Sequence, residues 1–142
     1  MMNLTRSRVA IGAAVVTATF FLFSIGSAQA QSVERLKAKI PFGFYAGETL
    51  LSAGDYEVQN LANGLIRLYN QNTHESAMIF TVGVRNGATE PSAKLVFNRY
   101  GEDHFLSEMC WPDRDGRKPL PSKAENQLAK TIKPVRIVSV AR

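Results

Sequence analysis

The sequence has very few of the residues that form covalent cross-links, metal sites and common catalytic centres. Its 142 residues include one cysteine, Cys110, and two histidines, His74 and His104. A single cysteine excludes an intramolecular disulfide, and zinc sites draw most of their ligands from cysteine and histidine. The chain also has no G-x-S-x-G nucleophile motif and no phosphate-binding loop. We therefore predict no catalytic, cofactor-binding or metal-binding residue.

The remaining polar residues offer weak candidates for chemistry. Glu57, Glu75 and Glu108 are isolated along the sequence and are expected to point outward, which does not suggest the paired carboxylates of a glycosidase. His104, Glu108 and Cys110 fall on alternate positions of a predicted strand and are therefore expected to share one face. They would be the first residues to substitute if the protein were an enzyme, but ordinary strand alternation also produces such a pattern.

The N-terminal thirty residues have the layout of a cleavable secretory signal. The first eight residues carry two arginines and no acid, and residues 9–23 are apolar apart from two threonines. Small residues at Ala28 and Ala30 then predict cleavage before Gln31. The alternative is an uncleaved membrane anchor, but a spanning helix needs about 20 apolar residues, and this run is shorter.

Cleavage at that point would leave one domain, residues 31–142, in the periplasm or outside the cell, with no membrane span. In an oxidising compartment Cys110 is a candidate free thiol that could be buried, linked to another chain, or reactive. Its apolar neighbours Met109 and Trp111 favour the buried state.

Charge is distributed unevenly along the predicted mature chain. Residues 31–113 carry a net charge of −3, whereas residues 114–142 carry +6. This basic C-terminal end could bind an anionic surface or an acidic envelope protein. More often such charge is a solvated face that keeps a small domain soluble. No nucleic-acid motif accompanies the charge, so nucleic acid is not a predicted partner.

Hydrophobic patterning predicts a mainly β fold. Short alternating or apolar runs separated by turn residues predict about eight strands, at 36–44, 49–51, 56–61, 65–70, 76–84, 94–100, 104–111 and 135–140. Such a series favours an antiparallel β-sandwich or a small barrel. Pro41 lacks an N–H group, which places the first strand at an edge or bends it there.

Three further features refine this fold. The sequences Asn63-Gly64 and Gly101-Glu102-Asp103 predict two hairpins, and residues 76–84, the most apolar run, predict a central strand. Residues 112–121 are expected to form a polar loop. Ser122-Lys123-Ala124-Glu125 fits a capping box that begins a short C-terminal helix, which should reach about residue 130.

The aromatic residues fit core positions: Phe42, Phe44, Phe80, Phe97, Phe105 and Trp111. In a domain of this size a filled core is favoured. The alternative is that these rings line a cavity for an apolar ligand, as in small lipid-binding barrels.

Several motifs resemble a family of short exported bacterial β-proteins. The sequences I-P-F-G-F at residues 40–44 and L-S-A-G-D-Y-E-V at residues 51–58 are similar to the family's I-P-F-x-F and L-x-A-G-x-Y-x-V signatures. Residues 95–101 and 120–125 resemble two further signatures. Ser52 stands where proline is usual, and Gly43 where aspartate is common. The resemblance implies a β fold and export, and it implies no activity.

These observations lead to three functional hypotheses. The first is a non-catalytic binding or structural module of the cell envelope. The second is a carrier that holds a small apolar ligand between sheets, and the third is an enzyme of an unrecognised type. The absence of a catalytic constellation in the sequence favours the first.

Overall fold

The fold of residues 33–85 and 91–142 is described by a computed structural model. The predicted signal segment and its cleavage site at Ala28, Ala30 and Gln31 lie outside these residues. The described elements are mainly strands with one small helix, in this order along the chain: β1 (Glu34–Ile40), β2 (Phe44–Ala46), β3 (Thr49–Leu51), β4 (Gly54–Asn60), β5 (Leu65–Asn70), β6 (Ser76–Val84), β7 (Lys94–Tyr100), β8 (Asp103–Cys110), β9 (Gly116–Pro119), α1 (Lys123–Leu128) and β10 (Val135–Val140).

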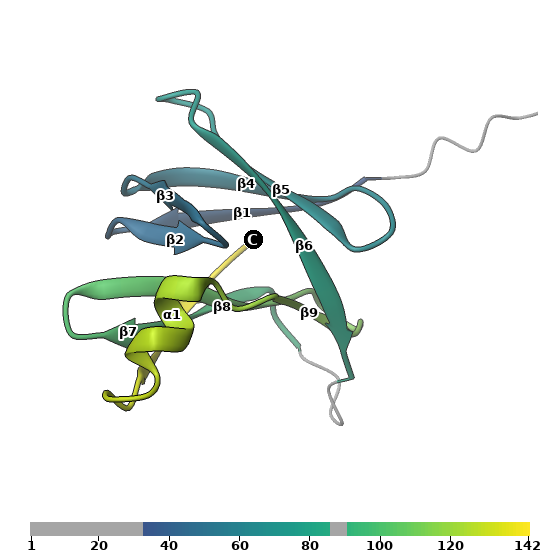
Figure 1. The fold of residues 1–142 in the computed structure, drawn as a ribbon. Helices are drawn as coiled ribbons and strands as arrows, with labels where there is room; N and C mark the ends of the chain where they lie inside the picture. The colour runs from purple at the N-terminus through teal and green to yellow at the C-terminus, as the bar shows by residue number, and fades with distance from the viewer. Residues whose placement is uncertain (1–32, 86–90) are drawn as a thin grey trace, which may run out of the picture. The chain divides into compact units, whose positions relative to one another are not determined.

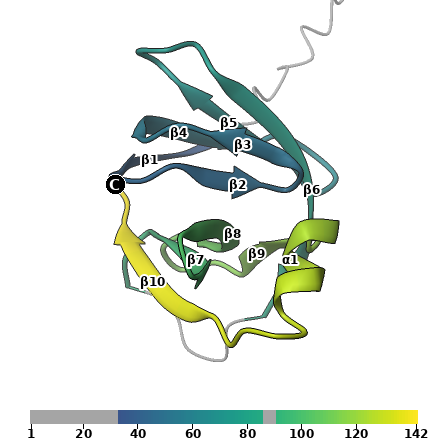
Figure 2. The same cartoon turned by 60° about the vertical axis from the view of Figure 1, so that its left-hand side comes forward.

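The strands pair into one sheet that is not closed. Its main path runs β1-β4-β5-β6-β9-β8-β2-β3, and β7 joins β8 to β10. Neighbours are antiparallel except β2 and β8, which meet in a short parallel pairing. The chain end returns to β1, where the N–H groups of Lys37 and Arg142 each donate to the other's carbonyl at 2.8 and 2.9 Å (Figure 2).

Strand β6 connects the two halves of this sheet. Its first part, Ser76–Phe80, pairs with β5, and its second part, Thr81–Val84, pairs with β9. Figure 1 shows β6 crossing from the group that contains β1, β4 and β5 to the group that contains β8 and β9. The predicted central position of this strand is therefore confirmed.

Turn chemistry explains the two predicted hairpins, and both are confirmed. Asn63 and Gly64 have φ values of 54° and 79° between β4 and β5, and positive φ at both central residues matches the right-handed twist of a tight hairpin. Gly101, with φ of 63°, turns the chain between β7 and β8.

Three boundaries differ from the sequence predictions. The predicted first strand ends at Ile40, and Phe44 starts the separate strand β2, because Pro41 cannot donate to a ladder. The predicted loop 112–121 contains β9, which pairs with β6. The helix ends at Leu128, where the N–H groups of Lys130 and Thr131 turn to carbonyls only three residues back. The strand count is therefore ten among the described residues.

The core is filled by side chains from each of the strands β1 to β8. The Phe44 ring meets the Tyr56 and Phe97 rings edge to face at 5.2 and 5.3 Å, the geometry that aromatic pairs prefer. Phe105 and Trp111 are also buried, and Phe42 packs on the core from its margin. The predicted core position of Phe80 is wrong, because this side chain is 69% exposed.

Candidate functional site

The outer face of β6 exposes large apolar side chains. Ala77 and Ile79 point into the core, so strand alternation sends Met78, Phe80 and Val82 outward, where they are 60%, 69% and 50% exposed. A strand that is apolar on both faces normally has both faces covered by other layers of the protein. We call Met78, Phe80 and Val82 the β6 stripe. Adjacent exposed apolar side chains of this size are typical of interaction sites.

Cations lie beside this stripe on both neighbouring strands. Arg67 on β5 is the register partner of Met78, and Lys118 on β9 is the partner of Val82. Residues directly opposite in an antiparallel pair share a face and lie about 5 Å apart at Cβ. The strands β5, β6 and β9 contain no acidic residue. The stripe is therefore apolar along its length and basic at its sides.

On the β5 side of the stripe, Arg67 contacts the aromatic ring of Tyr69. The Arg67 guanidinium carbon lies 5.0 Å from the centre of the Tyr69 ring, close enough for a cation–π interaction. The Tyr69 hydroxyl in turn lies 2.7 Å from His74 Nδ1. These contacts orient the ring of Tyr69 and keep the charge of Arg67 on the outer face.

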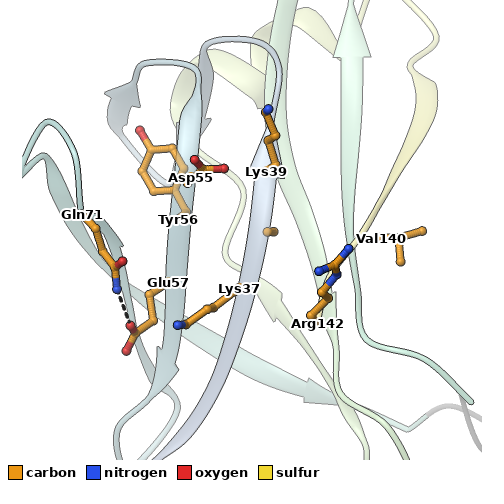
Figure 3. A pocket seen from close by; sticks show the side chains of 9 residues that line it. Lys37, Lys39, Asp55, Tyr56, Glu57, Gln71, Val140 and Arg142 are labelled. Atoms are coloured by element: carbon orange, nitrogen blue, oxygen red, sulfur yellow. Dashed lines mark hydrogen bonds between the residues drawn. The ribbon is translucent and has the colours of Figure 1, made fainter.

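A second candidate is a half-open groove of about 480 Å³ on β1 and β4 (Figure 3). It is lined by Lys37, Ala38, Lys39, Asp55, Tyr56, Glu57, Gln71, Val140 and Arg142. Its charges are paired across the strands, because Lys37 is the register partner of Glu57 and Lys39 is the partner of Asp55. Arg142 is the one further charged residue that lines the groove, so its lining carries three cations and two acids.

Glu57 is the one carboxylate of the groove that is buried, with 7% exposure. It accepts hydrogen bonds from Gln59 Nε2 at 2.6 Å and Gln71 Nε2 at 3.0 Å, and it pairs with Arg35 at 3.4 Å. The hydrogen bond from Gln59, helped by Arg35 and Gln71, holds the pKa of this carboxyl below its usual range despite burial. The expectation that Glu57 is simply an outward-facing residue is wrong, since it is buried and its partners come from three segments of the chain.

A third candidate is a polar cluster that joins α1 to β7. Ser122 caps the helix, and its hydroxyl accepts from the Glu125 N–H at 3.1 Å. The Glu125 carboxylate accepts from Asn98 Nδ2 at 3.2 Å and the Tyr100 hydroxyl at 3.4 Å. Half of the predicted capping box is thus present, while the carboxylate docks the helix onto the sheet. Burial, with the nearby Glu125 charge, raises the pKa of Tyr100. A hollow of about 220 Å³ adjoins this cluster.

Residues 51–58 make contacts that stabilise the turn between β3 and β4. The Tyr56 hydroxyl donates to the Ser52 carbonyl at 2.6 Å, and the Ser52 hydroxyl donates to the Glu75 carboxylate. A Cβ on Gly54 would lie 2.5 Å from Asn70 Nδ2, so a larger residue there would have to displace Asn70. The bond from Ser52 holds the pKa of the Glu75 carboxyl below the usual range.

Cys110 is buried, as its apolar neighbours predict. Its Sγ lies 3.4 Å from Glu108 Oε1, and Glu108 pairs with Arg136 at 3.2 Å. The predicted shared face of His104, Glu108 and Cys110 is wrong. Val96 pairs with Glu108 but Phe97 pairs with Leu106, so a bulge in β8 reverses the alternation between them. His104 instead stacks on Phe42, with ring centroids 3.9 Å apart.

The basic C-terminal end is divided among several places. Arg114 pairs with Glu34 and Arg136 with Glu108. Arg142 lies in the β1–β4 groove, whereas Lys118 lies beside the β6 stripe. The charge that is adjacent in sequence therefore does not act as one patch, and only part of it flanks the exposed apolar face.

Comparison with protein-family models, with curated proteins and with solved structures finds no match to this chain. Within residues 33–85 and 91–142, no helix is long and apolar enough to cross a membrane. The same residues bring no three His, Cys, Asp or Glu side chains together as a metal site would require.

Sequence reasoning missed the β6 stripe, although the signal for it was present. Residues 76–84 are apolar at both sets of alternate positions, a pattern that also predicts a central strand buried on both faces. A sheet strand can bury both faces only if another layer covers each one. The described part of the chain leaves the outer face of β6 uncovered at Met78, Phe80 and Val82.

Proposed function

We propose that this chain is an exported, non-catalytic binding module of the cell envelope and that it docks through the β6 stripe. The single observation that supports this proposal is the exposure of Met78, Phe80 and Val82 in a row on one strand. Leaving large apolar side chains in water costs about 25 cal/mol for each Å² of exposed apolar area. A partner that covers the stripe would recover that free energy.

Two observations favour a binding module over the alternatives. The rings of Phe44, Tyr56 and Phe97 pack against one another in the interior, where a carrier would hold its apolar ligand. The three residues suggested for an enzyme lie on two faces of β8, with His104 separated from Glu108 and Cys110. Export itself is supported by the signal-like pattern of residues 1–30 and is tested by sequencing the N-terminus of the exported protein, which should begin at Gln31.

Binding is tested by retention of the purified chain on an isolated envelope fraction. Val82→Ser and Val138→Ser form a matched pair, because both side chains are half exposed, at 50% and 52%, and Val138 lies on β10. We expect Val82→Ser and Phe80→Ser to weaken retention and Val138→Ser to leave it unchanged. Equal retention of all three variants and the parent chain would overturn the proposed function.

A further inference from the structure

We infer that the partner of the β6 stripe is the anionic headgroup surface of a lipid membrane. This inference rests on the proposed function and adds the chemistry of the partner. Side chains at alternate positions of one strand rise about 3.3 Å per residue, so Met78 and Val82 lie about 13 Å apart with Phe80 between them. The stripe is thus a line of three apolar side chains that can enter the headgroup region together.

The flanking charges fit an anionic surface. Arg67 stands opposite Met78 on one side, and Lys118 stands opposite Val82 on the other. These are the two cations of β5, β6 and β9 that share the face of the stripe, since Arg117 is opposite Gly83, and these strands contain no acid. The β1–β4 groove differs, because each of its strand lysines faces an acid. Apolar side chains bordered by Lys and Arg are the pattern that membrane-surface segments present to anionic lipid.

The shape of the stripe favours a lipid surface over a protein partner. Neither the β1–β4 groove nor the hollow beside α1 includes a residue of the stripe. Phe80 has 69% of its side chain exposed. A fluid headgroup layer can close around such side chains, whereas a protein would need a pocket of matching shape. An acidic protein surface is therefore the alternative that the experiment must separate.

The experiment places a tryptophan within the stripe, so that the signal reports that position and not residues 1–30. The full chain carrying Phe80→Trp is mixed with vesicles of phosphatidylcholine alone or of phosphatidylcholine with phosphatidylglycerol. Native Trp111 is buried and contributes a constant background. Val138→Trp on β10 is the matched control. We expect the emission of the Phe80→Trp variant to shift to shorter wavelength with the anionic vesicles and to be quenched by brominated lipid there.

Charge variants test the second part of the inference. A lysine or arginine near an anionic membrane contributes about 1 kcal/mol, which corresponds to about a fivefold change in partitioning. Arg67→Gln together with Lys118→Gln, in the Phe80→Trp background, should therefore weaken partitioning about 25-fold. Circular dichroism on each variant checks that the fold is retained.

The outcomes separate this inference from the proposed function. If Phe80→Ser abolishes retention on the envelope fraction while the Phe80→Trp variant shows no emission shift with anionic vesicles, the lipid inference is overturned and a protein partner is indicated. An emission shift that is equal with neutral vesicles, or that Val138→Trp shares, also overturns it. If Phe80→Ser leaves envelope retention unchanged, the proposed function fails as well.

Discussion

The α1–β7 cluster and the β6 stripe differ in whether their side chains are covered by the rest of the described chain. In the cluster, Glu125 on the helix accepts hydrogen bonds from Asn98 and Tyr100 on the sheet. In the stripe, Phe80 and its neighbours present apolar surface that nothing in the described chain covers. Polar residues therefore hold the fold together at one place, and apolar residues are left open at the other. Residues 95–101 and 120–125 thus make structural contacts with each other, while the candidate binding face lies outside these segments.

The largest expected effect compares a buried ring with an exposed one. Phe97→Ala removes a side chain with no exposure that contacts Phe42 and Phe44, and should lower the free energy of unfolding by about 3–5 kcal/mol. Phe80→Ala should change it by no more than about 0.5 kcal/mol. Urea unfolding followed by circular dichroism measures both. Similar losses for the two variants would contradict the assignment of Phe80 to the surface.

A second test compares two glycines. Gly54→Ala would press a methyl group against Asn70, whose Oδ1 accepts from the N–H groups of residues 72 and 73, so we expect a loss of about 1–3 kcal/mol. Gly83→Ala on β6 has open space around it and should stay within about 0.5 kcal/mol. In an Asn70→Ala background the cost of Gly54→Ala should shrink. An unchanged cost there would show that the contact with Asn70 is not the cause.

A third test removes the link between α1 and β7. Glu125→Ala leaves Asn98 and the buried Tyr100 hydroxyl without their carboxylate partner, which should cost about 1–3 kcal/mol. Loss of the cap in Ser122→Ala should cost about 1 kcal/mol. The exposed Lys123→Ala serves as the control for a change within the same helix. Thermal unfolding ranks the three variants, and a Glu125→Ala protein as stable as Lys123→Ala would exclude a docking role.

The smallest effect is a pH dependence set by Glu57. Because the pKa of this carboxyl is lowered in the folded protein, its contribution to stability is present above the unfolded-state pKa and is lost as the pH falls through the folded-state value. The loss therefore lies in the acidic range below the ordinary glutamate value of 4.5. Unfolding free energies across this range should fall less steeply for Glu57→Gln. Glu102→Gln, at an exposed hairpin position, controls for the loss of one negative charge, and identical slopes for both variants would contradict the prediction.

Much of the local structure could be predicted from the sequence because its causes lie within a few residues. Asn63-Gly64 supplies the two positive φ values of a hairpin, and Ser122 supplies a helix cap. Burial of Cys110 followed from its apolar neighbours. The strand β9 could not be predicted in the same way, because its polar residues are drawn into the sheet by pairing with the second part of β6.

The candidate site was less predictable because it depends on which strands meet. The bulge in β8 arises from pairing with β7 and separates His104 from Glu108, although both lie on alternate positions in the sequence. Gln59 is a local partner of Glu57 on β4, but Gln71 and Arg35 reach Glu57 only when β1, β4 and the end of β5 come together. Non-local contacts of this kind leave no periodic pattern along the chain.

The sequence by itself determined that this protein is mainly β, where most of its strands and turns lie, and that a capped helix precedes the last strand, because backbone preferences and alternation are local properties. Only the tertiary structure decided which faces are covered. Met78, Phe80 and Val82 are as apolar as any buried strand residues, yet they are exposed. Whether a strand face is buried depends on which other parts of the chain pack on it. In the described residues, nothing packs on the outer face of β6 at Met78, Phe80 and Val82.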